Sequence, residues 1–471
     1  MKEVTAPASK SDAHRALFCA ALSDRPWSVV INGSCDDIEA TRRCAAAVSA
    51  WRAAQSGAGN GCGGEGLQET VLDVGESGAT LRFALPVAAA LGQPAAFRLH
   101  GRLPERPLSP LRELLEEHGA VIAESENCAE IRVSGQLTPG EYRLPGNVSS
   151  QFISGLLLAL PLLPGDSRIV VTGALESAPY IDMTLQTLRR FGVTIRIDTV
   201  GTAEPSVSTI TAAADPDAIR IYTVPGCQRF GIPEDAVSCM TGENPQPFDT
   251  LTYAVEGDWS AAANWIVAGV IGPEPVLVKG LSTDSAQGDR GVVDILQKMG
   301  ADVEIRKPGG AEPDRAEVIA RPSRSRLRGI RIDASQTPDL VPILALAATQ
   351  AEGVTEIYNA ERLRLKESDR LQSTAEVLQA LGFDVAEKPS GLIIHGTPQA
   401  IRGTSQTTRT AAEAIIIDTK NDHRIAMMVA VASIVSDRAV VVRGGACVAK
   451  SYPAFFTEFG RVGSSDRLTV L

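Results

Sequence analysis

Five short segments of the chain place cations, hydroxyls or single carboxylates where helices rich in Ala and Leu would begin. They are Lys10 to Arg15, Gly146 to Gln151, Arg364 to Arg370, Asn421 to Arg424 and Cys447 to Lys450. The start of a helix offers unpaired backbone N–H groups and a partial positive charge, which together attract phosphate or carboxylate. Because these segments also carry more cations than a neutral ligand needs, we predict one site for a small polyanion.

The first two segments can present several polar groups to one anion. Lys10 and Ser11 precede Arg15 by one helical turn, so all three could face a phosphate. The alternative is a capped helix with solvated charges. Ser149, Ser150 and Gln151 lead into an apolar helix that must be buried, so the hydroxyls should point into a cleft, although one serine can instead be the N-cap.

The third segment places a carboxylate beside two cations. Lys366 and Arg370 are four residues apart and Glu367 lies three residues before Arg370, so the three share a helical turn. Such a glutamate could shuttle protons. The alternative is an ordinary ion-pair ladder on the surface.

Two further positions remain open between structural and chemical roles. Asp339 follows Pro338 at the head of an apolar helix, where an acid is either a partner of the helix dipole or a base. His423 and Arg424 could form a buried structural pair. A lone histidine is more often a packing residue than a catalyst, so Arg424 is the stronger candidate for ligand binding.

The elements that position these groups alternate between helix and strand, which predicts a mixed α/β fold with an internal structural repeat. Strands are expected at Ser167 to Thr172, Pro275 to Val278 and Ala439 to Val442. The best-formed helix should run from Asp369 to Leu381 with an exposed polar start, and Gly382 should end it. Helices are expected to begin near Ser11, Gly78, Pro110, Ser150, Ile181, Ser260, Asp289, Pro338, Ser368 and Asp422.

Two stretches lack periodicity and are expected to be loops, namely Gln55 to Gln68 and Pro225 to Pro247. Inside the first, Gly61 to Gly66 satisfies G-x-G-x-x-G. It trails a helical stretch and no helix opens after it, so a dinucleotide site is not favoured.

Composition excludes several classes of protein. A chain of 471 residues should form two or more domains. A net charge of −11 with only 4% aromatic residues argues against nucleic-acid binding. Eight cysteines without a C-x-x-C pair suggest neither zinc nor disulfides. Because no apolar run could span a bilayer and the start of the chain lacks a signal pattern, we expect no membrane association and a cytoplasmic location.

In order along the chain, these motifs resemble the 5-enolpyruvylshikimate-3-phosphate synthase family, which is the target family of glyphosate. The resemblance runs from Lys10 to about Phe456. Besides the five segments it includes Gly75 to Phe83, Arg102 to Pro107, Ser177 to Asp182 and Val255 to Asp258.

The resemblance implies the two-domain enolpyruvyl transferase fold, with six β/α repeat units whose helix N-termini face the interdomain cleft. One domain would comprise residues 9–254. The other would be discontinuous, comprising residues 1–8 and 255–471. We expect a monomer without metal or cofactor.

The resemblance also implies the reaction, in which the enolpyruvyl group of phosphoenolpyruvate passes to the 5-hydroxyl of shikimate 3-phosphate by addition and elimination. Asp339, Glu367 and Lys10 would be catalytic. Shikimate 3-phosphate would contact Lys10, Ser11, Arg15, Ser149, Ser150, Gln151, Ser177, Asp339 and Lys366. Phosphoenolpyruvate would contact Lys10, Gly78, Arg102, Gln151, Arg370, Arg424 and Lys450.

Some positions depart from the family's pattern. Arg362 stands where an Asn often contacts the first substrate, and Glu76-Ser77 replace Asn-Ala before Gly78. The Glu-Ser-Gly form resembles another branch of the same family. One rival is UDP-N-acetylglucosamine enolpyruvyl transferase, in which Asn rather than Ser11 follows the N-terminal Lys. The other is a catalytically silent anion-binding relative, which would have lost Asp339, Glu367 or a phosphate-binding Arg.

Overall fold

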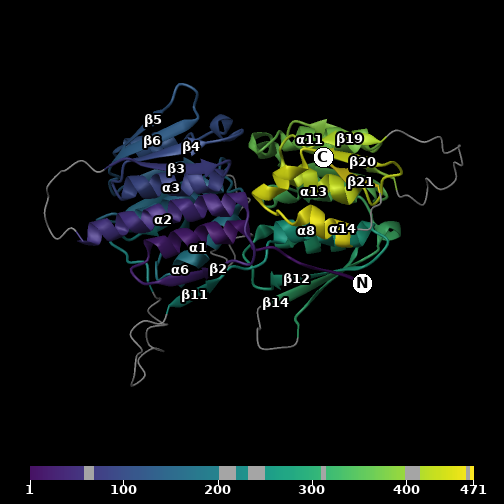
Figure 1. Cartoon of the computed structure of the whole chain (residues 1–471), viewed down its shortest axis with the longest axis horizontal. Helices are drawn as coiled ribbons and strands as arrows, with labels where there is room; N and C mark the ends of the chain where they lie inside the picture. The colour runs from purple at the N-terminus through teal and green to yellow at the C-terminus, as the bar shows by residue number, and fades with distance from the viewer. Residues whose placement is uncertain (58–67, 201–218, 232–249, 309–314, 398–413, 463–466) are drawn as a thin grey trace, which may run out of the picture. The chain divides into compact units, whose positions relative to one another are not determined.

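The computed structural model describes residues 1–57, 68–200, 219–231, 250–308, 315–397, 414–462 and 467–471 (Figure 1). The glycine-rich motif at 61–66 and the stretch 232–247 of the second expected loop lie outside these residues. The first expected loop was wrong at its start, because helix α2 (Asp36–Gly57) continues through its first three residues.

The chain divides into two compact units. The amino-terminal unit comprises Lys10–Asn32 and Asp36–Val255, and the carboxyl-terminal unit comprises Met1–Ser9, Gly33–Cys35 and Glu256–Leu471. The first strand, β1 (Lys2–Thr5), pairs in parallel with β12 (Val276–Ser282), so the start of the chain belongs to the carboxyl-terminal unit. The domain boundaries themselves stay a prediction.

The amino-terminal unit alternates helices and strands. Its helices are α1 (Lys10–Leu22), α2, α3 (Gly78–Ala90), α4 (Leu111–Glu117), α5 (Ser150–Ala159) and α6 (Ala178–Arg190), with short 3₁₀ turns η1 (Leu103–Glu105) and η2 (Leu160–Leu162). Its strands are β2 (Trp27–Val30), β3 (Thr70–Gly75), β4 (Ala95–Leu99), β5 (Ala120–Glu124), β6 (Glu130–Gly135), β7 (Glu141–Pro145), β8 (Ser167–Thr172), β9 (Arg196–Val200), β10 (Ile219–Val224) and β11 (Leu251–Ala254).

The carboxyl-terminal unit follows the same pattern. Its helices are α8 (Trp259–Ile271), α9 (Val292–Lys298), α10 (Val341–Thr349), α11 (Arg370–Ala380), α13 (His423–Ala432) and α14 (Phe455–Val462). Its 3₁₀ turns are η4 (Gly288–Gly291), η5 (Arg324–Arg326), η6 (Pro338–Leu340), η7 (Glu361–Leu365) and η8 (Gly445–Lys450). Besides β1 and β12, its strands are β13 (Asp302–Arg306), β14 (Arg315–Arg321), β15 (Arg331–Asp333), β16 (Gly353–Tyr358), β17 (Asp384–Lys388), β18 (Gly391–Gly396), β19 (Ile415–Asp418), β20 (Val440–Arg443) and β21 (Leu468–Val470).

Four sheets in the described part of the chain share one topology. Each joins a parallel pair of strands to two antiparallel strands, in the orders β3-β4-β6-β5, β7-β8-β10-β9, β1-β12-β14-β13 and β15-β16-β18-β17. In three of them one helix connects the parallel pair, namely α3, α5 or α10, which is the usual crossover for parallel strands. The expected α/β fold class is therefore confirmed, whereas the count of six repeats stays a prediction.

Apolar helices form the centre of each unit. Almost every residue of α3 and α5 is buried in the amino-terminal unit, and the same holds for α8, α10 and α13 in the carboxyl-terminal unit. Figure 1 shows α13 beside α8 and α14 within that unit, and these helices are in contact. A helix that is apolar on all sides must be buried, so the polar groups available to a ligand lie at its start or in the turn before it, as Asp339 of η6 does before α10. Among the described helices, none is long and apolar enough to span a membrane.

Polar caps fix where these helices begin. The side chains of Ser77, Ser149, Asp258, Asp369 and Asp422 each accept a hydrogen bond from a backbone N–H in the first turn of α3, α5, α8, α11 and α13. The ten expected starts lie within three residues of an observed helix or 3₁₀ turn. The largest difference is at α6, which begins at Ala178 rather than near Ile181, after Ser177 in the left-handed conformation.

One glycine lets α3 and α5 approach closely. A Cβ at Gly155 would lie 2.1 Å from the backbone carbonyl oxygen of Arg82, which cannot move without shifting α3. We predict that Gly155→Ala lowers the free energy of unfolding by about 1–3 kcal/mol. Gly460→Ala is the matched control, since Gly460 of α14 has open space around it and alanine favours a helix. Urea unfolding of both variants tests this, and equal midpoints would contradict it.

Candidate active site

The start of α1 carries an ion pair rather than free charges. The Lys10 ammonium lies 2.7 Å from the Asp37 carboxylate on α2, and both side chains are largely buried. Ser11 is half-buried beside it. A ligand anion that binds Lys10 must therefore compete with Asp37 or share the ammonium with it.

Arg15 is buried one turn further along α1. Its guanidinium donates to the Thr184 hydroxyl at 2.8 Å and to the backbone oxygens of Tyr180 and Ser11 at 2.7 and 2.5 Å. These acceptors are neutral, and burial lowers the pKa of Arg15 to about 10. An incoming anion would stabilise the charged form, so the position suits anion binding.

The two serines at the start of α5 divide their roles. Ser149 is the N-cap and its hydroxyl accepts a hydrogen bond from the backbone N–H of Gln151, which confirms the capping alternative for this residue. Ser150 is buried. The Gln151 amide oxygen accepts a hydrogen bond from Arg82 at 2.7 Å. Ser177, also buried, precedes α6 in the left-handed conformation.

Two guanidinium groups lie against Gly78. A Cβ there would meet the Nη1 atoms of Arg82 and Arg106 at 2.6 and 2.8 Å. The absence of a side chain thus leaves the first N–H groups of α3 beside two cations, an arrangement suited to an anion. Arg102 has a different partner. Its guanidinium pairs with the Glu105 carboxylate at 3.1 Å, and its side chain is 43% exposed.

Sequence reasoning assigned a role to Arg102 and none to Arg82 or Arg106. The available signal for Arg82 was its position four residues after Gly78 on the same helix, which places both on one face. For Arg106 no local pattern was available, because its approach to Gly78 depends on the turn that follows β4.

A chain of hydroxyl groups ties the first three helices together. The His14 ring contacts the Thr41 hydroxyl at 2.6 Å, Thr41 contacts Thr80 at 2.6 Å, and Thr80 contacts the Ser77 cap at 2.7 Å. Burial, followed by the charges of Lys10 and Arg15, lowers the pKa of His14 well below its ordinary value. The neutral ring therefore holds α1 and α2 in register with the start of α3.

In the carboxyl-terminal unit one buried arginine joins three carboxylates. The Arg370 guanidinium donates to Asp422 at 2.9 and 3.2 Å, to Asp339 at 2.9 Å and to Glu367 at 2.6 Å. Its side chain is 1% exposed. The expected exposed start of this helix was wrong, and so was the alternative of a surface ion-pair ladder, because the three carboxylates compensate the cation inside the protein.

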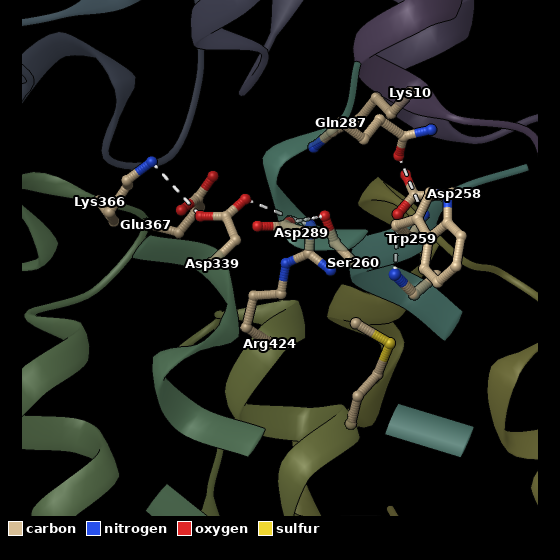
Figure 2. A network of polar contacts seen from close by, with 12 residues as sticks. Lys10, Asp258, Trp259, Ser260, Gln287, Asp289, Asp339, Lys366, Glu367 and Arg424 are labelled. Carbon is tan, nitrogen blue, oxygen red and sulfur yellow. Dashed lines mark hydrogen bonds and ion pairs between the residues drawn. The ribbon is translucent and has the colours of Figure 1, made fainter. Parts of the chain in front are cut away.

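Asp339 sits among three cations. Besides Arg370 it contacts Lys366 at 3.4 Å and Arg424 at 3.3 Å (Figure 2). Burial by itself would raise the pKa of Asp339, but the charges of Lys366, Arg424 and Arg370 hold it well below its ordinary value. Asp339 is therefore a carboxylate among these cations.

The remaining predicted cations lie at the start of α13 and in η8. Arg424 is buried, and its backbone N–H is capped by Asp422. Lys450 is buried and donates to the backbone oxygen of Asn421 at 2.8 Å. His423 is buried beside them, which agrees with a packing role. Arg362 donates to the backbone oxygen of Ser335 at 3.1 Å.

The predicted residues thus form two groups, one in each unit. Lys10, Ser11, Arg15, Gly78, Ser149, Ser150, Gln151 and Ser177 belong to the amino-terminal unit, together with Arg102. Asp339, Lys366, Glu367, Arg370, Arg424 and Lys450 belong to the carboxyl-terminal unit. Each group combines cations with helix starts, as an anion site requires.

Solved structures with the same fold define the class of this protein. It resembles EPSP synthase from Acinetobacter baumannii with a TM-score of 0.67 at 22% identity, covering 98% of this chain and 95% of that one. It resembles the enolpyruvyl transferase NikO from Streptomyces tendae with a TM-score of 0.63 at 18% identity and the same coverage. The fold is that of the enolpyruvyl transferases.

Sequence comparison narrows the class to one family. The family described as EPSP synthase (3-phosphoshikimate 1-carboxyvinyltransferase) matches residues 1–220 and 231–459. Proteins named 3-phosphoshikimate 1-carboxyvinyltransferase from Clostridium novyi and Clostridium kluyveri are 35% and 36% identical, each over 98% of this chain and 95% of the relative. The chain belongs to the EPSP synthase family, which confirms the resemblance seen in the sequence.

The buried cluster around Arg370 generates a stability prediction. Arg370→Met would leave three carboxylates without their shared cation, so we expect the free energy of unfolding to fall by about 3–5 kcal/mol. Arg364→Met is the control, because Arg364 pairs with Asp369 and Glu387 near the surface and should cost at most about 1 kcal/mol. Chemical denaturation compares the two, and equal losses would argue against the cluster.

Proposed function

We propose that this protein transfers the enolpyruvyl group of phosphoenolpyruvate to the 5-hydroxyl of shikimate 3-phosphate and releases phosphate. The observation that carries the proposal is the 35–36% identity, over nearly the whole chain, to proteins named 3-phosphoshikimate 1-carboxyvinyltransferase. The product would lead to chorismate and the aromatic amino acids. We also propose that the enzyme is a monomer, and both phosphorylated substrates fit a cytoplasmic enzyme.

Shikimate 3-phosphate is proposed to bind at the starts of α1, α5 and α6 and beside η6. Arg15 is suited to its phosphate, since the guanidinium is buried and its hydrogen bonds within the described part of the chain go to neutral acceptors, although the charge of Asp12 also acts on it. Lys366 and Asp339 would hold the acceptor's hydroxyl groups from the carboxyl-terminal unit. The full set is Lys10, Ser11, Arg15, Ser149, Ser150, Gln151, Ser177, Asp339 and Lys366.

Phosphoenolpyruvate needs several cations for its phosphate and carboxylate. The set proposed from the sequence is Lys10, Gly78, Arg102, Gln151, Arg370, Arg424 and Lys450. To it we add Arg82 and Arg106, because their guanidinium groups border Gly78. Arg370 would act mainly by fixing the carboxylates around it, since its N–H groups already donate to three of them.

The proposed chemistry is addition followed by elimination. Asp339 takes the proton of the 5-hydroxyl as that oxygen attacks C2 of phosphoenolpyruvate. Glu367, which must carry a proton when both substrates are bound, delivers it to the methylene carbon. In the elimination the roles reverse: Glu367 takes back a proton from the methyl group, the C–O bond to phosphate breaks as Asp339 returns its proton to that leaving group, and the double bond is restored. Lys10 stabilises the charge on the departing phosphate. No step requires a metal or an organic cofactor.

Two alternative functions can be weighed against the proposed one by the residues found at a few positions. A UDP-N-acetylglucosamine enolpyruvyl transferase shares the donor, but the names of the relatives and Ser11 after Lys10 favour shikimate 3-phosphate. A silent anion-binding relative would lack one of the catalytic acids or cations, whereas Asp339, Glu367 and Arg424 are all present and adjacent to opposite charges.

Release of inorganic phosphate distinguishes these functions. We expect the purified protein to release phosphate from phosphoenolpyruvate with shikimate 3-phosphate and not with UDP-N-acetylglucosamine. Asp339→Asn and Glu367→Gln should each lower kcat by about 10²–10⁴-fold while ligand binding persists. Release with neither acceptor would contradict the proposed function, and near-normal turnover of both variants would contradict the assigned roles.

The two arginines after β4 should differ in their effect on the donor. We predict that Arg106→Gln raises KM for phosphoenolpyruvate by at least about tenfold, because a charge-assisted contact to the anion is lost. Arg102→Gln, which removes a half-exposed partner of Glu105, should change it less than about threefold. Steady-state kinetics measures both, and the reverse order would show that Arg102 contributes more to donor binding than Arg106 does.

A further inference from the structure

Asp289 is a buried acid for which the proposed chemistry has no role. It lies on η4, the short turn that follows β12, and the residue is 2% exposed. The Ser260 hydroxyl at the start of α8 donates a short hydrogen bond to its Oδ2 atom. Its Oδ1 atom is buried, and no residue in the described part of the chain hydrogen-bonds to it. A carboxylate in that position is poorly solvated, which favours the protonated form.

The groups around Asp289 belong to the candidate site. Charges from three elements act on it, namely those of Asp339 on η6, Arg424 on α13 and Asp258, the cap of α8. Figure 2 shows Asp289 and Ser260 next to Asp339 and Arg424. The Arg424 Nε atom is buried as well, and among the described residues it has no hydrogen-bond partner. Arg424 keeps its positive charge, but how far that charge is compensated depends on the protonation of the acids beside it.

Burial and the negative charge of Asp339 raise the pKa of Asp289 to about 7, while the hydrogen bond from Ser260 and the charge of Arg424 oppose the rise. The pKa of Asp339 is lowered instead, because three cations keep it ionised. Two neighbouring acids of one cluster thus differ in protonation state near neutral pH, and only Asp289 titrates there.

We propose that Asp289 is a positioning residue that carries a proton beside Arg424 and thereby sets how strongly Arg424 attracts the donor anion. This inference rests on the proposed function. When Asp289 is neutral, the positive charge of Arg424 is less compensated and an anion binds more tightly. When Asp289 loses its proton, a third negative charge joins Asp339 and Asp258, and anion binding weakens.

The sign of the pH effect follows directly. KM for phosphoenolpyruvate should rise as the pH increases through about 7. By linkage, binding of the anion should in turn draw a fraction of a proton onto Asp289. Stability follows the same group, because its folded-state pKa lies above the ordinary value of 3.8 and its ionisation is therefore easier in the unfolded chain. The stability contributed by neutral Asp289 is therefore lost as the pH rises from about 4 to about 7. Above that pH the contribution of Asp289 to the free energy of unfolding no longer changes.

Asp289→Asn and Ser260→Ala test the proposal together. Asparagine keeps the shape but cannot titrate, so the increase in KM that Asp289 causes, on the order of fivefold, should disappear. Comparison with the unchanged protein at each pH cancels the titration of the substrates themselves. Ser260→Ala removes a hydrogen bond that favours the carboxylate, so it should keep the pH dependence and move its midpoint upward. A purely structural Asp289 would give neither result.

Two binding and stability measurements accompany the kinetics. Calorimetry with phosphoenolpyruvate in buffers of different ionisation enthalpy should show less proton uptake for Asp289→Asn than for the unchanged protein near pH 7–8. The unfolding temperature of Asp289→Asn relative to the unchanged protein should increase from pH 5 to pH 7 and then level off.

Each outcome decides one question. Equal pH profiles for Asp289→Asn and the unchanged protein would overturn the inference, as would a downward or absent shift in Ser260→Ala. If Asp289→Asn does not fold, the Ser260→Ala midpoint alone decides. If no acceptor supports phosphate release, the proposed function fails, whereas the calorimetric difference and the unfolding profile still test the proton on Asp289.

Discussion

The carboxyl-terminal unit depends on the compensation of one buried guanidinium. Arg370 can satisfy Asp339, Glu367 and Asp422 at once because its N–H groups form a planar fork with several donor directions. These carboxylates come from η6, from the residue segment before α11 and from the cap of α13. A buried cation left uncompensated is costly, so the three helix starts are held in one arrangement.

In the amino-terminal unit the helix starts are also held together, but mostly by neutral hydrogen-bond acceptors. Hydroxyls from Thr41, Thr80 and Ser77 connect the starts of its helices, and Arg15 is held by a threonine hydroxyl and backbone oxygens. Neutral acceptors leave most of the cation's charge available to a ligand. The two units therefore differ in chemistry, because the amino-terminal unit offers mainly positive charge, whereas the carboxyl-terminal unit combines cations such as Arg424 with carboxylates for proton transfer.

The sequence predicted the helix starts well, because capping residues and apolar runs are local signals. Ser77, Ser149 and Asp422 are caps in the structure, and strand Ser167–Thr172 has the expected bounds. The sequence could not predict which arginine approaches Gly78, since that depends on the path of the chain after β4. Nor could it show that Arg370 is buried, because its partners Asp339 and Asp422 lie 31 and 52 residues away.

The cations around Asp339 also explain how a base with so low a pKa can accept a proton once the substrates are bound. Lys366, Arg424 and Arg370 keep Asp339 ionised, which makes it a weak base. The proposed donor is an anion that would neutralise Arg424, and the acceptor would draw Lys366 toward its hydroxyl groups, so the pKa of Asp339 should rise only as both bind. Proton transfer is then coupled to occupancy of the site. A solitary aspartate without these cations would lack that dependence on both ligands.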